Sequence, residues 1–202
     1  MLIRPLSLRL TLCTVIALFA GSARAQRVIA AGPPLDTSPP AEAHQFDFLL
    51  GDWKVVALPK VSALVAMIHG QPKLAGSWKA WRSVDGFGVE DEMRLASDEG
   101  DPLAFTHTLR VYDRKAHHWT GASLDVYRTT LQTTTAVWQN GKMLTDGVGT
   151  NEEGKAYISR GWYYDVTPQS FRYQQQRSYD HGATWEDVRI TIEAQRATHA
   201  HR

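Results

Sequence analysis

Apolar and polar residues alternate along most of the chain from Phe46 onward, with a period of two residues instead of the 3.6 of a helix. The segments are rich in Val, Thr, Tyr, Trp and Phe, and Gly, Asp or Asn separate them. This pattern predicts an all-β protein. The expected strands, about ten in number, cover residues 52–57, 77–84, 88–95, 105–113, 118–126, 130–138, 142–150, 156–165, 170–178 and 185–194.

The turn residues between these segments favour hairpins. Asp85-Gly86, Asn140-Gly141 and Gly154 stand where a tight turn needs a positive φ. Consecutive strands joined by short turns predict an antiparallel meander of about ten strands, closed into a barrel.

Residues 58–70 break the alternation. Val61, Leu64, Val65 and Ile68 fall on one helical face, and Gly70 follows them. We expect a short helix or lid at a barrel mouth, with an apolar hairpin excursion as the alternative.

The first 25 residues read as a secretory signal peptide. Arg4 and Arg9 lead an apolar run that is too short to remain as a membrane span, and Ala-Arg-Ala ends at Ala25. We expect cleavage after Ala25 and a periplasmic or secreted protein. The single cysteine, Cys13, leaves with this leader, so no disulfide is expected.

The remaining chain suits one domain. Removing 25 of the 202 residues leaves 177, and the loss of three arginines changes the formal charge from +1 to −2. This balance argues against nucleic acid as a partner, and no membrane anchor is expected after cleavage. We assign residues 26–43, rich in Ala and Pro, to a flexible tether, 44–196 to the barrel and 197–202 to a frayed tail.

Four motifs together resemble a family of small, uncharacterised bacterial proteins with a lipocalin-like (calycin-type) β-barrel. They are H-Q-F-D-F-L-L-G-D-W at 44–53, V-D-G-F-G-V-E-D-E-M-R at 84–94, L-R-V-Y-D-R-K-A-H-H-W at 109–119 and S-Y-D-H-G-A-T-W at 178–185. The likeness runs from His44 to Arg196. It implies a fold, and it brings no activity or catalytic residues with it.

G-D-W at 51–53 is also similar to the G-x-W that opens a lipocalin barrel. The resemblance implies a structural role for Trp53, whose ring would close the base of the barrel. Arg189 or Arg196 would cover it.

S-Y-D-H-G-A-T-W fits the Asp-box pattern S-x-D-x-G-x-T-W of sialidases. In that motif the Asp and Ser side chains accept backbone N–H groups across a tight turn, and the Trp packs beneath it. Since one copy lies between the last two expected strands, we expect Asp180, Gly182 and Trp185 to stabilise a hairpin, without catalysis.

No established catalytic or metal-binding motif is found. The sequence has no G-x-S-x-G elbow, no phosphate-binding glycine loop, and no pair of His or Cys at metal spacing. We therefore assign no catalytic residue and no metal ligand. Glu90, Asp91 and Glu92 lack an opposing carboxylate for glycosidase chemistry, and a solvated outer face is the preferred interpretation.

Arg, Trp and Tyr recur together on single strand faces. Facing inward, they would line a pocket for a small amphipathic or anionic ligand. Facing outward, the arginine stems would lie over exposed rings. The alternation leaves both open. The candidate ligand-binding residues are Trp78, Arg82, His107, Arg110, Tyr112, Trp119, Tyr127, Arg160 and Trp162.

His107 shares its face with Phe105, Leu109 and Val111. This favours a core histidine, with a haem ligand or a catalytic base as alternatives. No cofactor is expected, haem at His107 being the exception to test.

The sequence therefore favours a periplasmic or secreted barrel that binds a small, partly apolar molecule without catalysis; the chain has seven Trp and seven Tyr. One alternative is an isomerase, hydratase or hydrolase in the lumen, using His107 or an acidic residue with Arg110. The other is an envelope protein that binds a partner protein.

Overall fold

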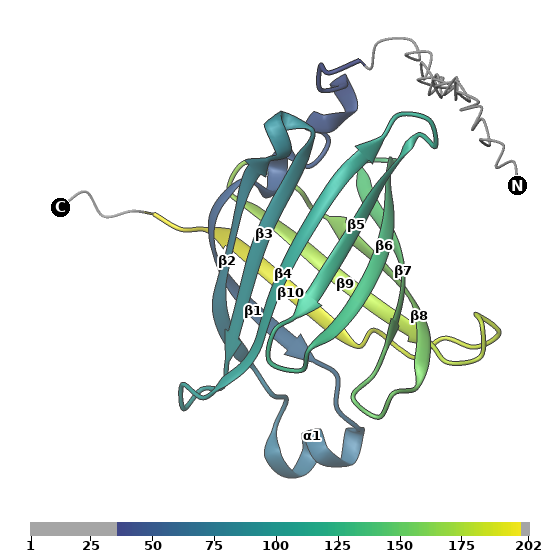
Figure 1. Cartoon of the computed structure of the whole chain (residues 1–202). Coiled ribbons are helices and arrows are strands. Elements are labelled where there is room, and N and C mark those ends of the chain that lie inside the picture. Colours follow the sequence, from purple (N-terminus) through teal and green to yellow (C-terminus); the bar gives the residue numbers. More distant parts are fainter. Residues whose placement is uncertain (1–35, 199–202) are drawn as a thin grey trace, which may run out of the picture. The chain divides into compact units, whose positions relative to one another are not determined.

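A computed structural model of the chain describes residues 36–198. Ten antiparallel strands follow one another in chain order round a single barrel, and β1 pairs with β10 to close it (Figure 1). The predicted fold class, an all-β meander of ten strands closed into a barrel, is confirmed. The strands are β1 (Gly51–Pro59), β2 (Leu74–Ser83), β3 (Gly88–Ala96), β4 (Pro102–Asp113), β5 (His118–Asp125), β6 (Thr130–Gln139), β7 (Lys142–Thr150), β8 (Ala156–Tyr164), β9 (Ser170–Ser178) and β10 (Ile190–Arg196).

The turns form where the sequence places residues that accept positive φ. Asn140 and Gly141, between β6 and β7, have φ of 51° and 74°, and Gly154 closes the β7–β8 turn with φ of 78°. A two-residue turn with both φ values positive matches the twist of the strands it joins. The β2–β3 connection is a 3₁₀ turn, η3 (Val84–Gly86).

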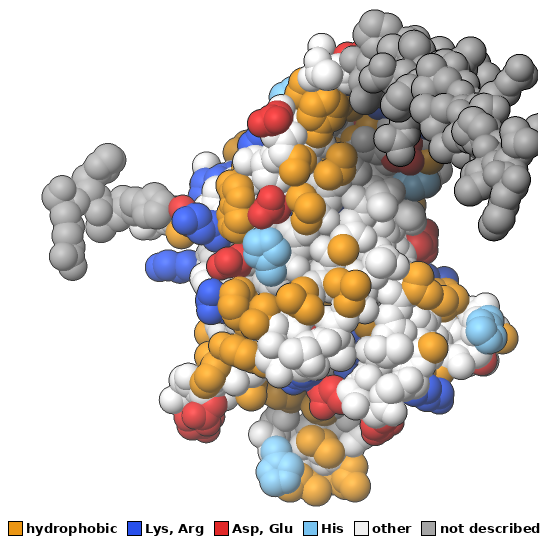
Figure 2. All heavy atoms as spheres, viewed as in Figure 1, with side chains coloured by type: hydrophobic (Ala, Val, Ile, Leu, Met, Phe, Trp, Pro, Cys, Tyr) orange, Lys and Arg blue, Asp and Glu red, His pale blue; other side chains and the backbone are white. Residues whose placement is uncertain are grey.

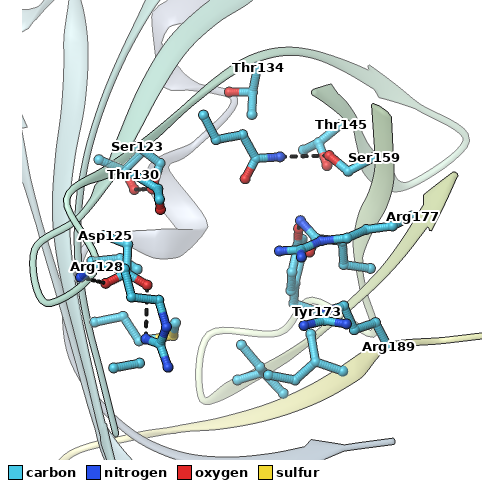
Figure 3. A pocket seen from close by; sticks show the side chains of 18 of the residues that line it. Ser123, Asp125, Arg128, Thr130, Thr134, Thr145, Ser159, Tyr173, Arg177 and Arg189 are labelled. Carbon is cyan, nitrogen blue, oxygen red and sulfur yellow. Dashed lines mark hydrogen bonds and ion pairs between the residues drawn. The ribbon is translucent and has the colours of Figure 1, made fainter. Parts of the chain in front are cut away.

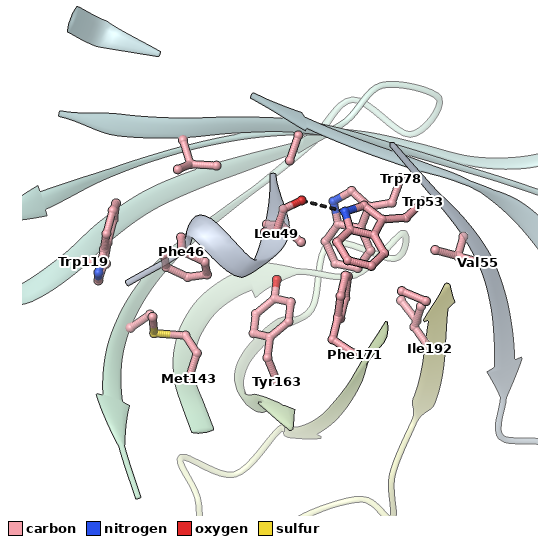
Figure 4. Packing of buried hydrophobic residues seen from close by; sticks show 14 of the residues in the cluster. Phe46, Leu49, Trp53, Val55, Trp78, Trp119, Met143, Tyr163, Phe171 and Ile192 are labelled. Carbon is pink, nitrogen blue, oxygen red and sulfur yellow. Dashed lines mark hydrogen bonds between the residues drawn. The ribbon is translucent and has the colours of Figure 1, made fainter. Parts of the chain in front are cut away.

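One end of the barrel is filled by the segment that precedes β1. It forms two 3₁₀ turns, η1 (Ala41–His44) and η2 (Asp47–Leu49), and its Phe46 and Leu49 are fully buried among the strands (Figure 4). Trp53 donates its indole N–H to the Leu49 carbonyl at 2.7 Å. The hydrophobic core is therefore concentrated at this closed end, where rings from β5, β8 and β9 pack against the segment and rings from β1 and β2 pack against the β9 ring.

Arg196, at the end of β10, covers Trp53 from outside. Its guanidinium carbon lies 4.1 Å from the ring centroid, and its Nη1 donates to the Leu50 carbonyl at 3.1 Å. Of the two arginines considered for this role, Arg189 lies instead at the other end of the barrel, just before β10.

The opposite end carries the loops that surround an open mouth. The segment 58–70 contains a helix here, α1 (Ala63–His69), whose N-cap Ser62 accepts from the Val65 N–H. The short helix expected in this segment is therefore present, but α1 buries no side chain, and Leu64 and Met67 are exposed. Figure 2 shows hydrophobic side chains gathered over this helix.

The expected segment boundaries fall partly outside the described residues. The predicted signal peptide, 1–25, lies wholly outside them. The folded part begins before His44, because η1 starts at Ala41 and Ala43 is fully buried. The Ala197 N–H still donates to the Asp52 carbonyl at 2.8 Å. Within residues 36–198, no helix is long and apolar enough to cross a membrane.

Candidate functional site

A cavity of about 820 Å³ occupies the barrel lumen between the packed core and the mouth (Figure 3). All ten strands contribute to its lining. Rings of Phe46, Trp78, Trp119 and Tyr163 form its floor, because these side chains belong both to the lining and to the buried core. A ten-strand barrel is wide enough to leave such a space when its core fills only one end.

The lining has two chemically different walls. The wall from β4 to β9 carries hydroxyl and amide groups, whereas the wall from β10, β2 and β3, together with Ala104 near the start of β4, is largely apolar. Two polar pairs are already bonded: Gln132 donates to Ser159 at 2.6 Å, and Thr108 donates to Ser123 at 3.0 Å. The polar wall includes Ser123, Thr130, Gln132, Thr134, Thr145, Ser159 and Gln175, and the apolar wall Leu74, Met93, Leu95, Ala104, Ile190 and Ile192.

A buried ion pair lies at the floor. Arg110 of β4 donates through Nη1 to Oδ2 of Asp91 on β3, and the Trp78 indole N–H donates to Oδ1 of Asp91 at 2.8 Å. Burial lowers the pKa of Arg110, but the Asp91 carboxylate outweighs it, so the pKa is raised and Arg110 stays charged. Asp91 is only 1% exposed, which corrects the interpretation of the whole acidic triplet as a solvated face.

The other cations of the lining differ in whether a carboxylate faces them. Lys60 pairs with Asp187, and Arg128 pairs with Asp125 at 3.1 Å and with Glu152. Arg177 and Arg189 have no ion-pair partner among residues 36–198. Figure 3 shows both of these side chains directed into the cavity.

Three of the nine candidate residues line the cavity. Trp78 and Arg110 lie at the floor with Asp91, and Trp119 donates its indole N–H to the Gln45 side chain at 3.0 Å. The strand faces that carry these three residues point into the lumen, one of the two directions that the sequence left open. Whether these residues bind a ligand stays a prediction.

Two candidates lie at the closed end, outside the cavity lining. Arg82 donates to the Ala43 carbonyl at 2.5 Å and pairs with Asp47. Tyr112 packs edge-on against Trp119, with ring centroids 5.7 Å apart. Arg82 thus holds the segment that fills the barrel end, and Tyr112 packs in the core beside it, so their positions indicate structural roles.

Four candidates face away from the lumen. Arg160 and Trp162 alternate along β8 with inward Ser159 and Tyr163, and the guanidinium of Arg160 lies 4.1 Å from the Trp185 ring centroid. Tyr127 lies in the β5–β6 turn and is 51% exposed. Arg160 and Trp162 face outward because side chains alternate along a strand, whereas Tyr127 lies in a turn; none of the three is among the residues that line the cavity.

His107 is also on the outer surface, not in the core. Its Nε2 lies 3.3 Å from Glu90 and its Nδ1 3.6 Å from Glu92, and its side chain is 38% exposed. The ring is therefore not placed to ligate a haem inside the lumen or to act on a molecule there. Among the described residues, no group of three or more His, Cys, Asp or Glu is arranged to hold a metal.

Sequence reasoning missed Arg177 and Arg189. A signal for Arg177 was present, because Phe171, Tyr173, Gln175 and Arg177 share one face of β9 and Phe171 is a strongly apolar anchor for the inside. For Arg189 there was none. The expected last strand began at residue 185, whereas β10 starts at Ile190.

The Asp-box hairpin connects β9 to β10 at the mouth end. The Ser178 hydroxyl donates to the Asp180 carboxylate at 2.7 Å and accepts the Gly182 N–H at 2.8 Å. The Asp180 carboxylate also accepts two bonds from Thr184, one from the backbone N–H at 2.8 Å and one from the side-chain hydroxyl at 2.5 Å. Gly182 has φ of 92°. The Thr184 and Ser178 hydrogen bonds lower the pKa of Asp180 to about 2. These contacts describe a stabilised turn.

Comparison with known proteins adds little to this evidence. No family model and no curated protein matches the chain. Among solved structures, the one titled "Structure of EF1p2_mFAP2b bound to DFHBI" is similar over 78% of this chain and 100% of that chain, with 11% sequence identity and a TM-score of 0.42. The resemblance to uncharacterised lipocalin-like proteins stays a prediction. The fold and the candidate site rest on the strand pairing and the cavity of the chain itself.

Proposed function

We propose that the barrel binds one small amphipathic molecule in its lumen. The observation that carries the proposal is the cavity of about 820 Å³, closed at one end by the core and open at the other. Its volume lies within the roughly 300–1,000 Å³ typical of small-molecule sites. One wall of the cavity is apolar, as in other small-molecule sites, and the polar groups of the opposite wall are available to orient a ligand.

The two walls define the kind of molecule that fits. An apolar body would cover Met93, Ile190 and Ile192, whose contact with water is unfavourable. Hydroxyl or carbonyl groups along one edge of the same molecule would face Thr134, Thr145 and their neighbours on the polar wall. We therefore expect the ligand to be polar along one edge and apolar along the other.

The predicted location belongs to the same proposal. The sequence of residues 1–25 supports export, and a protein that binds a small molecule outside the cytoplasm is consistent with it. Fractionation of cells that express the full chain should recover protein starting at Gln26 from the periplasm or the medium. Recovery of uncleaved chain in the cytoplasm would contradict the location and leave the cavity proposal standing.

The neutral probe N-phenyl-1-naphthylamine tests lumen binding, because its fluorescence rises in apolar surroundings. We expect one probe per barrel. Thr134→Phe, which places a ring in the cavity, should weaken binding at least about tenfold. Thr133→Phe is the matched control, since Thr133 is exposed on the outer face of the same strand.

Two results would contradict the proposal. Either the wild-type barrel fails to bind the probe, or Thr134→Phe binds it as tightly as Thr133→Phe does. The second result would place the probe on an exposed surface, such as α1. Circular dichroism and thermal unfolding establish that both variants are folded.

A further inference from the structure

We propose that the ligand of the lumen is an anion, whose carboxylate, sulfonate or phosphate group is bound by Arg177 and Arg189 at the mouth. This inference rests on the proposed function, since it names the chemistry of the molecule in the same cavity. It assigns the charge recognition to two residues outside the sequence-based candidate set.

The first argument for an anion site is the balance of charges in the cavity lining. Five cationic side chains line the cavity, namely Lys60, Arg110, Arg128, Arg177 and Arg189. The first three face a carboxylate within the described chain. Arg177 and Arg189 do not, so the side of the cavity formed by β9 and the start of β10 has an uncompensated positive charge that an anion would neutralise.

The second argument is the position of Arg177. Its guanidinium carbon lies 4.0 Å from the ring centroid of Tyr157, and this stacking holds the planar group in place. Its Nε is buried and has no hydrogen-bond partner among residues 36–198. A guanidinium that is held in place, has no carboxylate beside it and is directed into the cavity is suited to bind an oxyanion there through its terminal N–H groups.

Arg189 is held close to the same place. Its backbone N–H donates to the Gln175 carbonyl at 2.8 Å, which fixes it beside β9, and Gln175 and Arg177 point to the same face of that strand. Figure 3 shows the two arginine side chains reaching the cavity from neighbouring positions. Two positive side chains at neighbouring positions repel each other, and an anion that contacts both would relieve this repulsion.

The floor sets the orientation of the ligand. The Asp91–Arg110 pair is already balanced, and aromatic rings surround it. A second ionic group buried there would lose its hydration without gaining a partner. The anion therefore lies at the mouth, and the apolar body points toward the floor.

The test compares two probes that differ by one sulfonate group: 1-anilinonaphthalene-8-sulfonate and the neutral N-phenyl-1-naphthylamine. Wild-type protein should bind the sulfonate more tightly, and that affinity should fall as salt is added. Arg177→Gln and Arg189→Gln should each weaken the sulfonate about tenfold, because a hydrogen bond to a charged group is lost. The neutral probe should bind all of these proteins equally.

Arg172→Gln is the matched control. Arg172 lies on the outer face of β9 and pairs with Asp165 and Glu193, each at 3.4 Å. This variant removes the same charge from the same strand, so a general effect of net charge would appear in it too. We expect its affinity for both probes to be that of wild type.

The outcomes separate the inference from the proposed function. If the neutral probe binds in the lumen but the sulfonate binds no more tightly, or if both glutamine variants keep wild-type affinity for the sulfonate, the anion site is overturned and lumen binding stands. If neither probe binds, or Thr134→Phe affects neither, lumen binding and the anion site are both overturned.

Discussion

At the scale of single residues, the ion pair between Asp91 and Arg110 lies where the core meets the cavity. Both side chains are almost fully buried, and a third group, the Trp78 indole, also donates to Asp91. A buried ion pair adds little stability compared with an apolar pair of the same shape, but half of a pair is costly. Its presence at the floor of the cavity therefore shapes the site more than it stabilises the fold.

A stability comparison tests this view of the pair. Asp91→Ala leaves a buried guanidinium without its counter-charge and should lower the free energy of unfolding by about 3–5 kcal/mol. The double variant Asp91→Leu with Arg110→Met should lose less, because no charge remains. Urea unfolding measures both. If the double variant is as unstable as Asp91→Ala, the loss comes from packing and from the Trp78 N–H, and the electrostatic explanation is wrong.

At the scale of elements, the hairpin between β9 and β10 explains the sialidase-like motif without catalysis. The Asp180 and Ser178 side chains satisfy backbone N–H groups of the turn, and a Cβ on Gly182 would lie 3.4 Å from Ile158. The left-handed φ of Gly182 is strained for other residues. Ser178, Asp180 and Gly182 are therefore explained by the structure of the turn itself.

The hairpin should contribute to stability in a pH-dependent way. The pKa of Asp180 is about 2 in the folded protein, below the ordinary 3.8, so folding favours the carboxylate. Its contribution is present above about pH 4 and is lost as the pH falls toward 2. Asp180→Ala should lower the melting temperature at pH 7 by a few degrees, and its difference from wild type should shrink below pH 4.

A change in the same loop provides the control for this prediction. Asp187→Ala removes an exposed partner of Lys60 and should have little effect at any pH. Both variants should keep wild-type affinity for the neutral naphthyl probe. A melting temperature unchanged by Asp180→Ala, combined with lost probe binding, would show that the turn belongs to the site.

The strands could be predicted from the sequence, but the direction of their faces could not. Alternation and turn residues located all ten strands, because both are local properties of the chain. The inner face of β4 has Thr108 and Arg110, whereas Phe105 and Leu109 are on its outer face. Because half of the lumen is a cavity, many inward side chains are polar, and an apolar strand face is not necessarily the inner one. His107 shares a face with apolar residues and was therefore predicted in the core, whereas it lies on the outer surface.

At the scale of the whole molecule, the cavity exists only because β1 and β10 meet. All other strand pairs join neighbours along the chain, while the contact between Leu50 and Arg196 spans 146 residues. The same seam brings Trp53 opposite Arg196 and fixes the segment that fills the closed end. Enclosure of the lumen is thus a long-range property, which was predicted from the number and order of the strands and not from any single segment.

This closure has a kinetic consequence. Joining segments so distant costs loop entropy, so the seam is expected to form late in folding. A molecule bound inside the lumen would then stabilise only the finished barrel: it should slow unfolding and leave the rate of folding unchanged. Stopped-flow measurements with and without the sulfonate probe would show this, and faster folding with the probe would mean that the site forms before the barrel closes.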